Sequence, residues 1–339
     1  MSSERPVISC KNIWKVFGTD PEGYLAKLPP DMTFDDMRED GYIAGVKDVS
    51  LDVNKGEMLV IMGLSGSGKS TLVRCFSRLH EITSGTIEID GQDIMSLAEK
   101  DLIDLRRSKM GMVFQSFGLL PHRSVLDNVA FPLEMRGQDK HTRRERALEV
   151  IKLVGLEGRE DFFPRELSGG QQQRVGIARS LAIEPDIWFL DEPFSALDPL
   201  IRKEMQDEFL RLQQLLNKTI VFITHDFDEA LRLADRIAIM KDGAIEQCDT
   251  PDKIVLKPAT EYVRKFTEDV DKARVVRAGG LAEVGQTGIG DPVDASQTVR
   301  KMARMLVDDT RDFIPVTRAG KPIGALSRAE ALDVLLGDQ

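Results

Sequence analysis

A glycine-rich run at 63–70, Gly-Leu-Ser-Gly-Ser-Gly-Lys-Ser, has the residues that a phosphate-binding loop needs. Its glycines let the backbone take positive φ and point successive amides at an anion, while Lys69 supplies a mobile cation and Ser70 a hydroxyl for magnesium. An apolar run precedes the loop and helical spacing follows it, so a helix N-terminus adds its positive end to the phosphates. The candidate phosphate-binding residues are Gly63, Leu64, Ser65, Gly66, Ser67, Gly68, Lys69, Ser70 and Thr71.

An acidic pair, Asp191 and Glu192, follows the apolar run Ile187–Leu190. A carboxylate that ends a buried parallel strand emerges at the carboxyl edge of the sheet, where α/β proteins bind ligands. There Asp191 can hold magnesium together with Ser70. Glu192 can orient and polarise an attacking water, a contribution worth roughly 10²- to 10⁴-fold in rate. The alternative role of such a pair is a helix cap, which the lysine of the phosphate loop makes the weaker interpretation.

A second glycine-rich run at 167–171, Leu-Ser-Gly-Gly-Gln, precedes a predicted helix at Gln171–Leu181. The free amides of the helix and the Ser168 hydroxyl can bind a γ-phosphate. Alone, Ser-Gly-Gly is most often a turn. Because it lies between the phosphate loop and the acidic pair, it indicates a protein that closes two chains around ATP.

The elements around these motifs indicate a parallel α/β core. A strand at Met58–Met62 runs into the phosphate loop, and the runs Ile187–Leu190 and Thr219–Thr224 lack alternation, as strands covered on both faces by helices do. Val7–Phe17 alternates like a half-buried strand. Residues from about 115 to 182 are mostly helical in pattern and form a predicted helical subdomain.

Two segments lie outside this core pattern. The polar stretch that follows Gly18 contains the acidic run Asp35–Asp40 and is too long for a hairpin connection, so we predict an insertion at 19–44 with room for one short helix. After a hairpin around Asp242-Gly243, the first domain, 1–270, ends. Residues 271–292 read as a glycine-rich linker, and 293–339 as a small α+β module.

Composition limits the possible partners. The chain has 339 residues, 46 basic and 56 acidic, with a formal net charge of -10, so its overall field does not favour nucleic acid or anionic lipid. Its three cysteines lack metal spacing and suit a reducing compartment. No apolar run approaches the about 18 to 20 residues that a membrane span needs. Any membrane role is therefore expected to come through a partner subunit.

The order of the motifs resembles that of ATP-binding-cassette (ABC) ATPases. The resemblance implies a P-loop NTPase cassette of the α/β class, with a RecA-like parallel sheet core, an antiparallel β subdomain and an α-helical signature subdomain. It implies ATP and Mg²⁺ as ligands and ATP hydrolysis as the activity. In that family two cassettes pair head to tail, so each ATP would lie between the phosphate loop of one chain and the other chain's signature, here Leu167, Ser168, Gly169, Gly170 and Gln171.

The resemblance also assigns roles to single residues. Gln115 matches the loop glutamine that contacts magnesium and water, so that Ser70, Gln115 and Asp191 form the implied magnesium set. His225 matches the switch histidine that contacts the γ-phosphate. The D-loop at the dimer seam matches Ser195, Ala196, Leu197 and Asp198. Phe17 matches the aromatic that stacks on adenine, with Trp14 as the alternative.

A narrower resemblance covers about residues 7 to 270. Runs such as Met112-Val-Phe-Gln-Ser-Phe and Phe194-Ser-Ala-Leu-Asp-Pro-Leu-Ile-Arg are similar to the ATPase of bacterial glycine betaine/proline betaine importers. That subfamily implies a homodimer of cassettes, transmembrane permease subunits, indirectly an extracytoplasmic substrate-binding protein, and no nucleic acid. It places the chain on the cytoplasmic face of the inner membrane. Another ABC importer or exporter, or a soluble cassette ATPase, is the alternative.

The C-terminal module resembles a single cystathionine-β-synthase (CBS)-type repeat. The resemblance rests on Asp312-Phe-Ile-Pro-Val-Thr, on Ile323-Gly-Ala-Leu-Ser and on the predicted helix that follows. Such repeats work in pairs, and a homodimer would bring two together. Nucleotide-binding repeats carry Ser or Thr followed three residues later by Asp. At the corresponding positions this repeat has Ser327 and Glu330. A structural or dimerising role is therefore weighed equally with ligand binding or membrane sensing.

Overall fold

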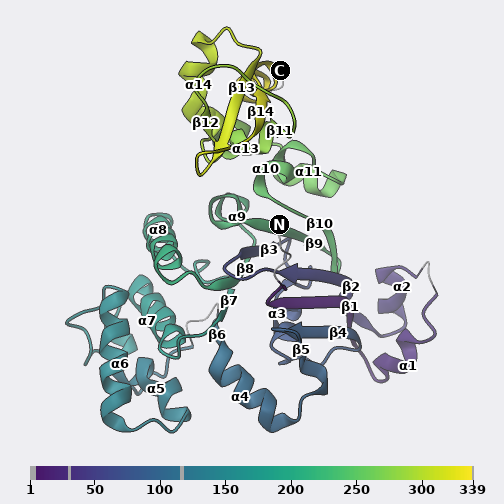
Figure 1. Cartoon of the computed structure of the whole chain (residues 1–339). Helices are drawn as coiled ribbons and strands as arrows, with labels where there is room; N and C mark the ends of the chain where they lie inside the picture. Colours follow the sequence, from purple (N-terminus) through teal and green to yellow (C-terminus); the bar gives the residue numbers. More distant parts are fainter. Residues whose placement is uncertain (1–4, 30–31, 115–117, 338–339) are drawn as a thin grey trace. The chain divides into compact units, whose positions relative to one another are not determined.

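A computed structural model describes residues 5–29, 32–114 and 118–337 (Figure 1). It divides into two compact units, Met1–Asp226 with Met240–Ile245, and Phe227–Ile239 with Glu246–Gln339. Among the described residues, no helix combines the length and the apolar character required to cross a membrane.

Four parallel strands form the core of the first unit, in the order β3-β8-β7-β6. Their bounds are β3 Met58–Met62, β6 Met110–Val113, β7 Ile187–Asp191 and β8 Thr219–Thr224. Every residue of β3, β7 and β8 is buried, which explains their unbroken apolar sequences. Met62 pairs with Thr224, and Asp191 with Ile223, so these three strands end at one edge. That edge receives the phosphate loop, the acidic pair and His225.

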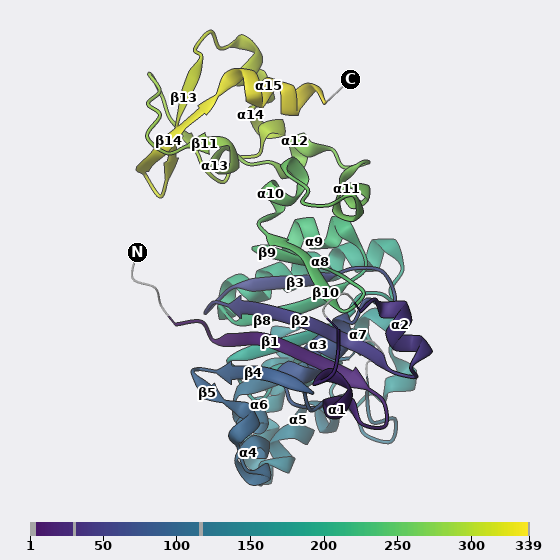
Figure 2. The same cartoon turned by 90° about the vertical axis from the view of Figure 1, so that its right-hand side faces the viewer.

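An antiparallel sheet of order β2-β1-β4-β5 forms the second layer of this unit (Figure 2). Its strands are β1 Ile8–Phe17, β2 Ile43–Val53, β4 Ser84–Ile89 and β5 Gln92–Asp93. The remaining helices near the two sheets are α3 Lys69–Phe76, η1 Ile94–Ser96, α4 Glu99–Lys109 and α8 Pro199–Leu216. Helix α3 begins at Lys69, within the last two residues of the glycine-rich run 63–70, so its N-terminus lies at the phosphate loop as the sequence predicts.

The insertion between β1 and β2 contains two short helices, α1 Pro21–Leu25 and α2 Phe34–Glu39, beside these strands (Figure 1). The insertion therefore contains one more helix than the sequence predicted. Asp20 caps α1, which has a proline in its first turn, and Thr33 caps α2 in a capping box with Asp36. These local hydrogen bonds satisfy the free amides of helices too short to show a hydrophobic period.

The predicted helical subdomain consists of α5 Val125–Met135, α6 Lys140–Leu153, η2 Pro164–Glu166 and α7 Gly169–Leu181. The three long helices lie together away from the antiparallel sheet (Figure 1). Ser124 caps α5, Asp139 caps α6 and Ser168 caps α7. Helix α7 therefore begins at Gly169, two residues before the expected start.

The second unit has its own sheet, of order β11-β14-β13-β12. Its strands are β11 Ala282–Glu283, β12 Val293–Asp294, β13 Phe313–Arg318 and β14 Lys321–Ser327. Its helices are α9 Phe227–Leu233, α10 Pro251–Leu256, α11 Glu261–Thr267, α12 Lys272–Val275, α13 Ala278–Leu281, α14 Val299–Asp308 and α15 Arg328–Leu336. The hairpin strands β9 Arg236–Lys241 and β10 Ala244–Asp249 each have residues in both units.

The segment expected to be a linker, 271–292, contains α12, α13 and β11. Strand β11 pairs with β14, with Ala282 opposite Leu326, so part of this segment is built into the C-terminal sheet. Buried Asp252 accepts a hydrogen bond of 2.6 Å from the Arg277 backbone amide, which joins the segment to α10. The division at 270 and the CBS-like character of the module remain predictions.

Candidate functional site

The phosphate loop forms a tight cradle. Gly63, Gly66 and Gly68 have φ of 150°, 83° and 99°. A Cβ at Gly63 would lie 2.2 Å from the Met240 carbonyl oxygen, and one at Gly68 2.2 Å from that of Gly45. Glycine is therefore required at both positions by conformation and by close backbone approach. The Gly243 amide donates to the Ser67 carbonyl at 3.0 Å and helps to fix the loop.

Lys69 is buried inside this loop, with 5% of its surface exposed. Its Nζ donates to the carbonyl oxygens of Gly63 at 2.9 Å and Leu64 at 3.0 Å. Burial lowers the pKa of this ammonium, opposed by the charges of Glu192 and Asp191. The cation is thus held at the loop by uncharged carbonyl oxygens, which an anionic phosphate can replace as its partner.

Ser70 and Asp191 meet at the end of β7. The Ser70 hydroxyl donates to Asp191 Oδ1 at 3.0 Å. Burial raises the pKa of Asp191, while the Ser70 hydrogen bond and nearby cations lower it. Within the described ranges, no cluster of three or more His, Cys, Asp and Glu side chains could hold a metal alone. This hard-oxygen pair therefore fits an ion such as Mg²⁺ whose other ligands are phosphates and water.

Removal of the Asp191 charge should stabilise the nucleotide-free chain. Because the folded-state pKa is raised, the folded form binds more protons than the unfolded form, and the free energy of unfolding falls as pH rises through that pKa. We expect Asp191→Asn to melt higher than wild type at about pH 8, with the difference shrinking toward about pH 4. Differential scanning calorimetry without nucleotide tests this. Asp186→Asn, at an exposed position before the same strand, is the control. A pH-independent difference would contradict the expected charge effect.

Glu192 and His225 lie next to each other at the same edge. Their contact joins His225 Nδ1 and Glu192 Oε2 at 3.1 Å. Glu192 has a left-handed backbone, φ 46°, and its amide donates to the Ile223 carbonyl oxygen at 3.1 Å. The chain therefore turns sharply at the end of β7. The Glu192 side chain is 18% exposed, whereas the His225 side chain is 57% exposed. The pair can hold a water and accept its proton.

Glu192, His225 and most of the phosphate loop line one cavity of about 700 Å³, whose wall does not include Asp191. Its wall consists of Phe17, Phe34, Arg38, Ile43, Ala44, Gly45, Leu64, Ser65, Gly66, Gly68, Lys69, Ser70, Thr71, Glu192 and His225. Phe17 is in this wall, with the Lys15 ammonium 4.9 Å from its ring centroid. Trp14 packs instead against the buried cluster of Val16, Met37 and Ala44. The adenine-stacking role of Phe17 remains a prediction, and Trp14 is placed less well for it.

The signature is apart from this cavity. Among the described residues, none of 167–171 contributes to the wall. Ser168 Oγ accepts from the Gln171 amide at 3.4 Å, and Gln171 Oε1 accepts from the Ser168 amide at 3.0 Å. In the predicted D-loop, Asp198 caps α8 and the Ser195 hydroxyl donates to the Glu192 carbonyl oxygen at 3.0 Å. The predicted magnesium ligand Gln115 lies outside the described residues.

The sequence reasoning missed the contribution of the insertion to the cavity. Phe34 and Arg38 of α2, and Ile43 to Gly45 at the start of β2, lie in its wall. A signal was available, since Thr33 and Asp36 form a capping box that predicts a helix just before β2. The sequence did not indicate which way that helix would face.

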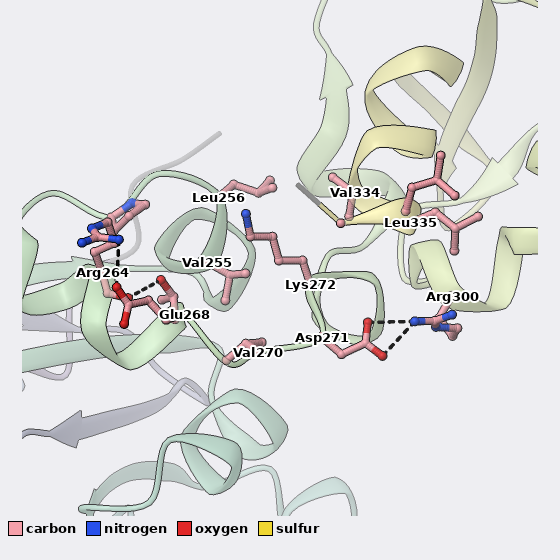
Figure 3. Close-up of a pocket in the computed structure, with 14 residues that line it drawn as sticks. Val255, Leu256, Arg264, Glu268, Val270, Asp271, Lys272, Arg300, Val334 and Leu335 are labelled. Carbon is pink, nitrogen blue, oxygen red and sulfur yellow. Dashed lines mark hydrogen bonds and ion pairs between the residues drawn. The ribbon is translucent and has the colours of Figure 1, made fainter. Parts of the chain in front are cut away.

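Other hollows lie elsewhere in the described part of the chain. A groove of about 500 Å³ in the first unit is walled mainly by apolar side chains, with Phe114 39% and Met135 48% exposed, and its wall also includes four arginines, Arg106, Arg107, Arg136 and Arg179. The second unit has a cavity of about 480 Å³ (Figure 3). There Arg264 pairs with Glu268 at 2.8 Å and Arg300 with Asp271 at 2.9 Å. Because these charges satisfy one another, we assign the second cavity no ligand.

Known proteins share both the sequence and the fold. The ABC transporter family profile matches residues 46–195. The trimethylamine N-oxide transport system ATP-binding protein TmoW of Ruegeria pomeroyi is 78% identical over 98% of this chain and 97% of its own. The chain belongs to the ABC transporter family. The predicted ABC ATPase activity and cassette fold are therefore confirmed.

Two other relatives extend this comparison of the ABC ATPase. The glycine betaine/proline betaine transport system ATP-binding protein ProV of Escherichia coli is 47% identical over 94% of this chain and 80% of its own. Among solved structures, the dimeric structure of MJ0796, a bacterial ABC transporter cassette, has a TM-score of 0.60 at 36% identity, covering 72% of this chain and 98% of that one. These matches agree with the quaternary-amine importer subfamily expected from the sequence.

Proposed function

We propose that this ABC ATPase energises the import of a methylated amine, with trimethylamine N-oxide as the first candidate substrate. The observation that carries the substrate is the 78% identity to a relative named for trimethylamine N-oxide transport. Glycine betaine, expected from the sequence, is the second candidate and is supported by the 47% identical relative. Both compounds carry a methylated nitrogen with a formal positive charge.

The proposed chemistry is the hydrolysis of the terminal phosphoanhydride of ATP. Glu192 accepts a proton from the attacking water. The oxygen of that water bonds to the γ-phosphorus while the bond between the γ-phosphorus and the bridging β–γ oxygen breaks, giving ADP and phosphate. His225, 3.1 Å from Glu192, keeps the carboxylate oriented. Lys69 and the loop amides neutralise the phosphate charge. Ser70 and Asp191 would hold Mg²⁺, which neutralises charge on the phosphates when bound.

The dimeric relative supports a composite site. The cavity contains the phosphate loop and Glu192, whereas Ser168 and Gly169 are exposed at the start of α7, outside the wall of that cavity. A second copy, paired head to tail, would bring its Ser168 to the open side of this cavity. The MJ0796 cassette, similar in sequence and fold, is a dimer.

A permease is the proposed membrane partner. The apolar groove contains Phe114, which directly precedes Gln115, and Met135 of α5. Exposed apolar surface of this kind is suited to a short amphipathic helix from a cytoplasmic loop of the permease. Through that contact the ABC ATPase would sit peripherally at the inner membrane. An extracytoplasmic binding protein would act indirectly, through the permease.

Transport in reconstituted vesicles tests the proposal. With the ABC ATPase and its co-purified permease in proteoliposomes, and the extracytoplasmic binding protein added outside the vesicles, ATP enclosed with the ATPase should drive uptake of radiolabelled trimethylamine N-oxide. Uptake should fall to the background level with Lys69→Ala, because the loop cation that balances the phosphates is lost. Unlabelled glycine betaine should compete less strongly than unlabelled trimethylamine N-oxide. Uptake of neither compound would overturn the proposed substrate class.

A further inference from the structure

The insertion places one helix in the wall of the nucleotide cavity. Helix α2 contributes Phe34 and Arg38, four residues apart and therefore on the same face. The Arg38 guanidinium lies 5.9 Å from the centroid of the Phe34 ring, within the range of a cation–π contact. The two side chains thus present a paired aromatic and cationic surface to the cavity that also contains Phe17 and Lys69.

The position of α2 is fixed by several contacts within the first unit. Met37 is fully buried with Val16 of β1 and Ala44 of β2. The rings of Tyr24 and Tyr42 stack with centroids 3.9 Å apart, and the Tyr24 hydroxyl donates to Asp40 at 2.8 Å. The insertion therefore has a small core of its own. An element held in this way can present side chains to a ligand at a defined place.

We propose that Phe34 and Arg38 are additional ATP-binding residues, which form a second wall of the nucleotide site beside Phe17. Phe34 packs on the adenosine moiety, because an aromatic face accepts a base or ribose in an otherwise polar cavity. Arg38 supplies a planar cation at the mouth of the cavity, which attracts the nucleotide's negative charge. This inference rests on the ATP site proposed above.

Two ligands separate the proposed roles. Inorganic triphosphate offers the phosphates alone, and ATP offers the phosphates with the nucleoside. Isothermal titration with each ligand should be carried out in the Glu192→Gln background, where turnover does not consume ATP. We expect Phe34→Ala to weaken ATP binding about threefold to thirtyfold while leaving triphosphate binding within about twofold. Phe34→Tyr should restore ATP binding, because the ring face is retained.

Arg38 provides a second variant on the exposed face of α2. Arg38→Ala should weaken the binding of both ligands severalfold at low salt, with the loss shrinking as salt is added. Arg38→Lys should recover part of the binding of both ligands. Glu39→Ala changes a neighbouring exposed residue that lies outside the described cavity wall, and should bind both ligands as wild type does.

The possible results are distinct. Unchanged ATP affinity in both Phe34→Ala and Arg38→Ala, with unaltered circular dichroism, would overturn the inference. So would an equal loss of ATP and triphosphate binding in Phe34→Ala, which would indicate damage to the phosphate site. Retention of ATP affinity by Lys69→Ala would instead overturn the proposed ATP site itself.

Discussion

Glu192→Gln is expected to lower ATP turnover by about 10²- to 10⁴-fold while ATP binding is retained. The amide has the size of the carboxylate and can still accept a hydrogen bond from His225 Nδ1. The 3.1 Å contact between the side chains at 192 and 225 should therefore persist. It cannot accept the proton of the attacking water at neutral pH. The loss should therefore appear in kcat and leave the dissociation constant of ATP nearly unchanged.

Steady-state hydrolysis and equilibrium binding by the purified variant check this expectation. Glu204→Gln makes the same change at an exposed position of α8 and serves as the control. Turnover by Glu192→Gln within a few-fold of wild type would remove Glu192 from the role of proton acceptor. A large loss in Glu204→Gln would show that the assay reports on stability rather than chemistry.

The core strands could be predicted because burial leaves a direct mark on sequence. Strand β3 has the predicted bounds, and β7 and β8 differ from the predictions by at most one residue. Strands covered on both faces have apolar side chains at nearly every position, so their sequences are near-continuous apolar runs. The phosphate loop was equally visible, because the positive φ of its glycines is a local backbone requirement that the sequence displays directly.

Other features depend on tertiary contacts that a local pattern does not encode. The distance between Glu192 and His225 follows from the pairing of β7 with β8, which no single motif specifies. Strand β11 has only two residues and exists because it pairs with β14, so its segment looked like a linker. The place of Phe34 in the cavity follows from the burial of Met37 against β1 and β2.

The second large effect concerns Ser168, which should act in the site of the other chain. Ser168→Arg places a bulky cation where the amides at the start of α7 would receive a γ-phosphate, and should abolish hydrolysis. It also removes a helix cap worth about 1 kcal/mol. Ser168→Asp keeps a capping oxygen but brings a negative charge toward the phosphate, so it should be equally inactive while retaining its stability.

The composite site makes a specific prediction for mixed dimers. Lys69→Ala disables the phosphate loop of a chain, and Ser168→Arg disables its signature. In a head-to-tail heterodimer both lesions fall in one site, so the other site is intact. Neither variant alone should hydrolyse ATP appreciably.

Mixing these two inactive chains is the most direct test of the proposal that each ATP site is shared between two copies. Equal amounts should recover hydrolysis at about a quarter of the wild-type sites, because half the dimers are mixed and each has one intact site. Differently tagged chains allow heterodimer formation to be verified by pull-down. Recovery of hydrolysis on mixing is the result that the shared site predicts. A complete absence of recovery, with heterodimers demonstrated, would contradict it.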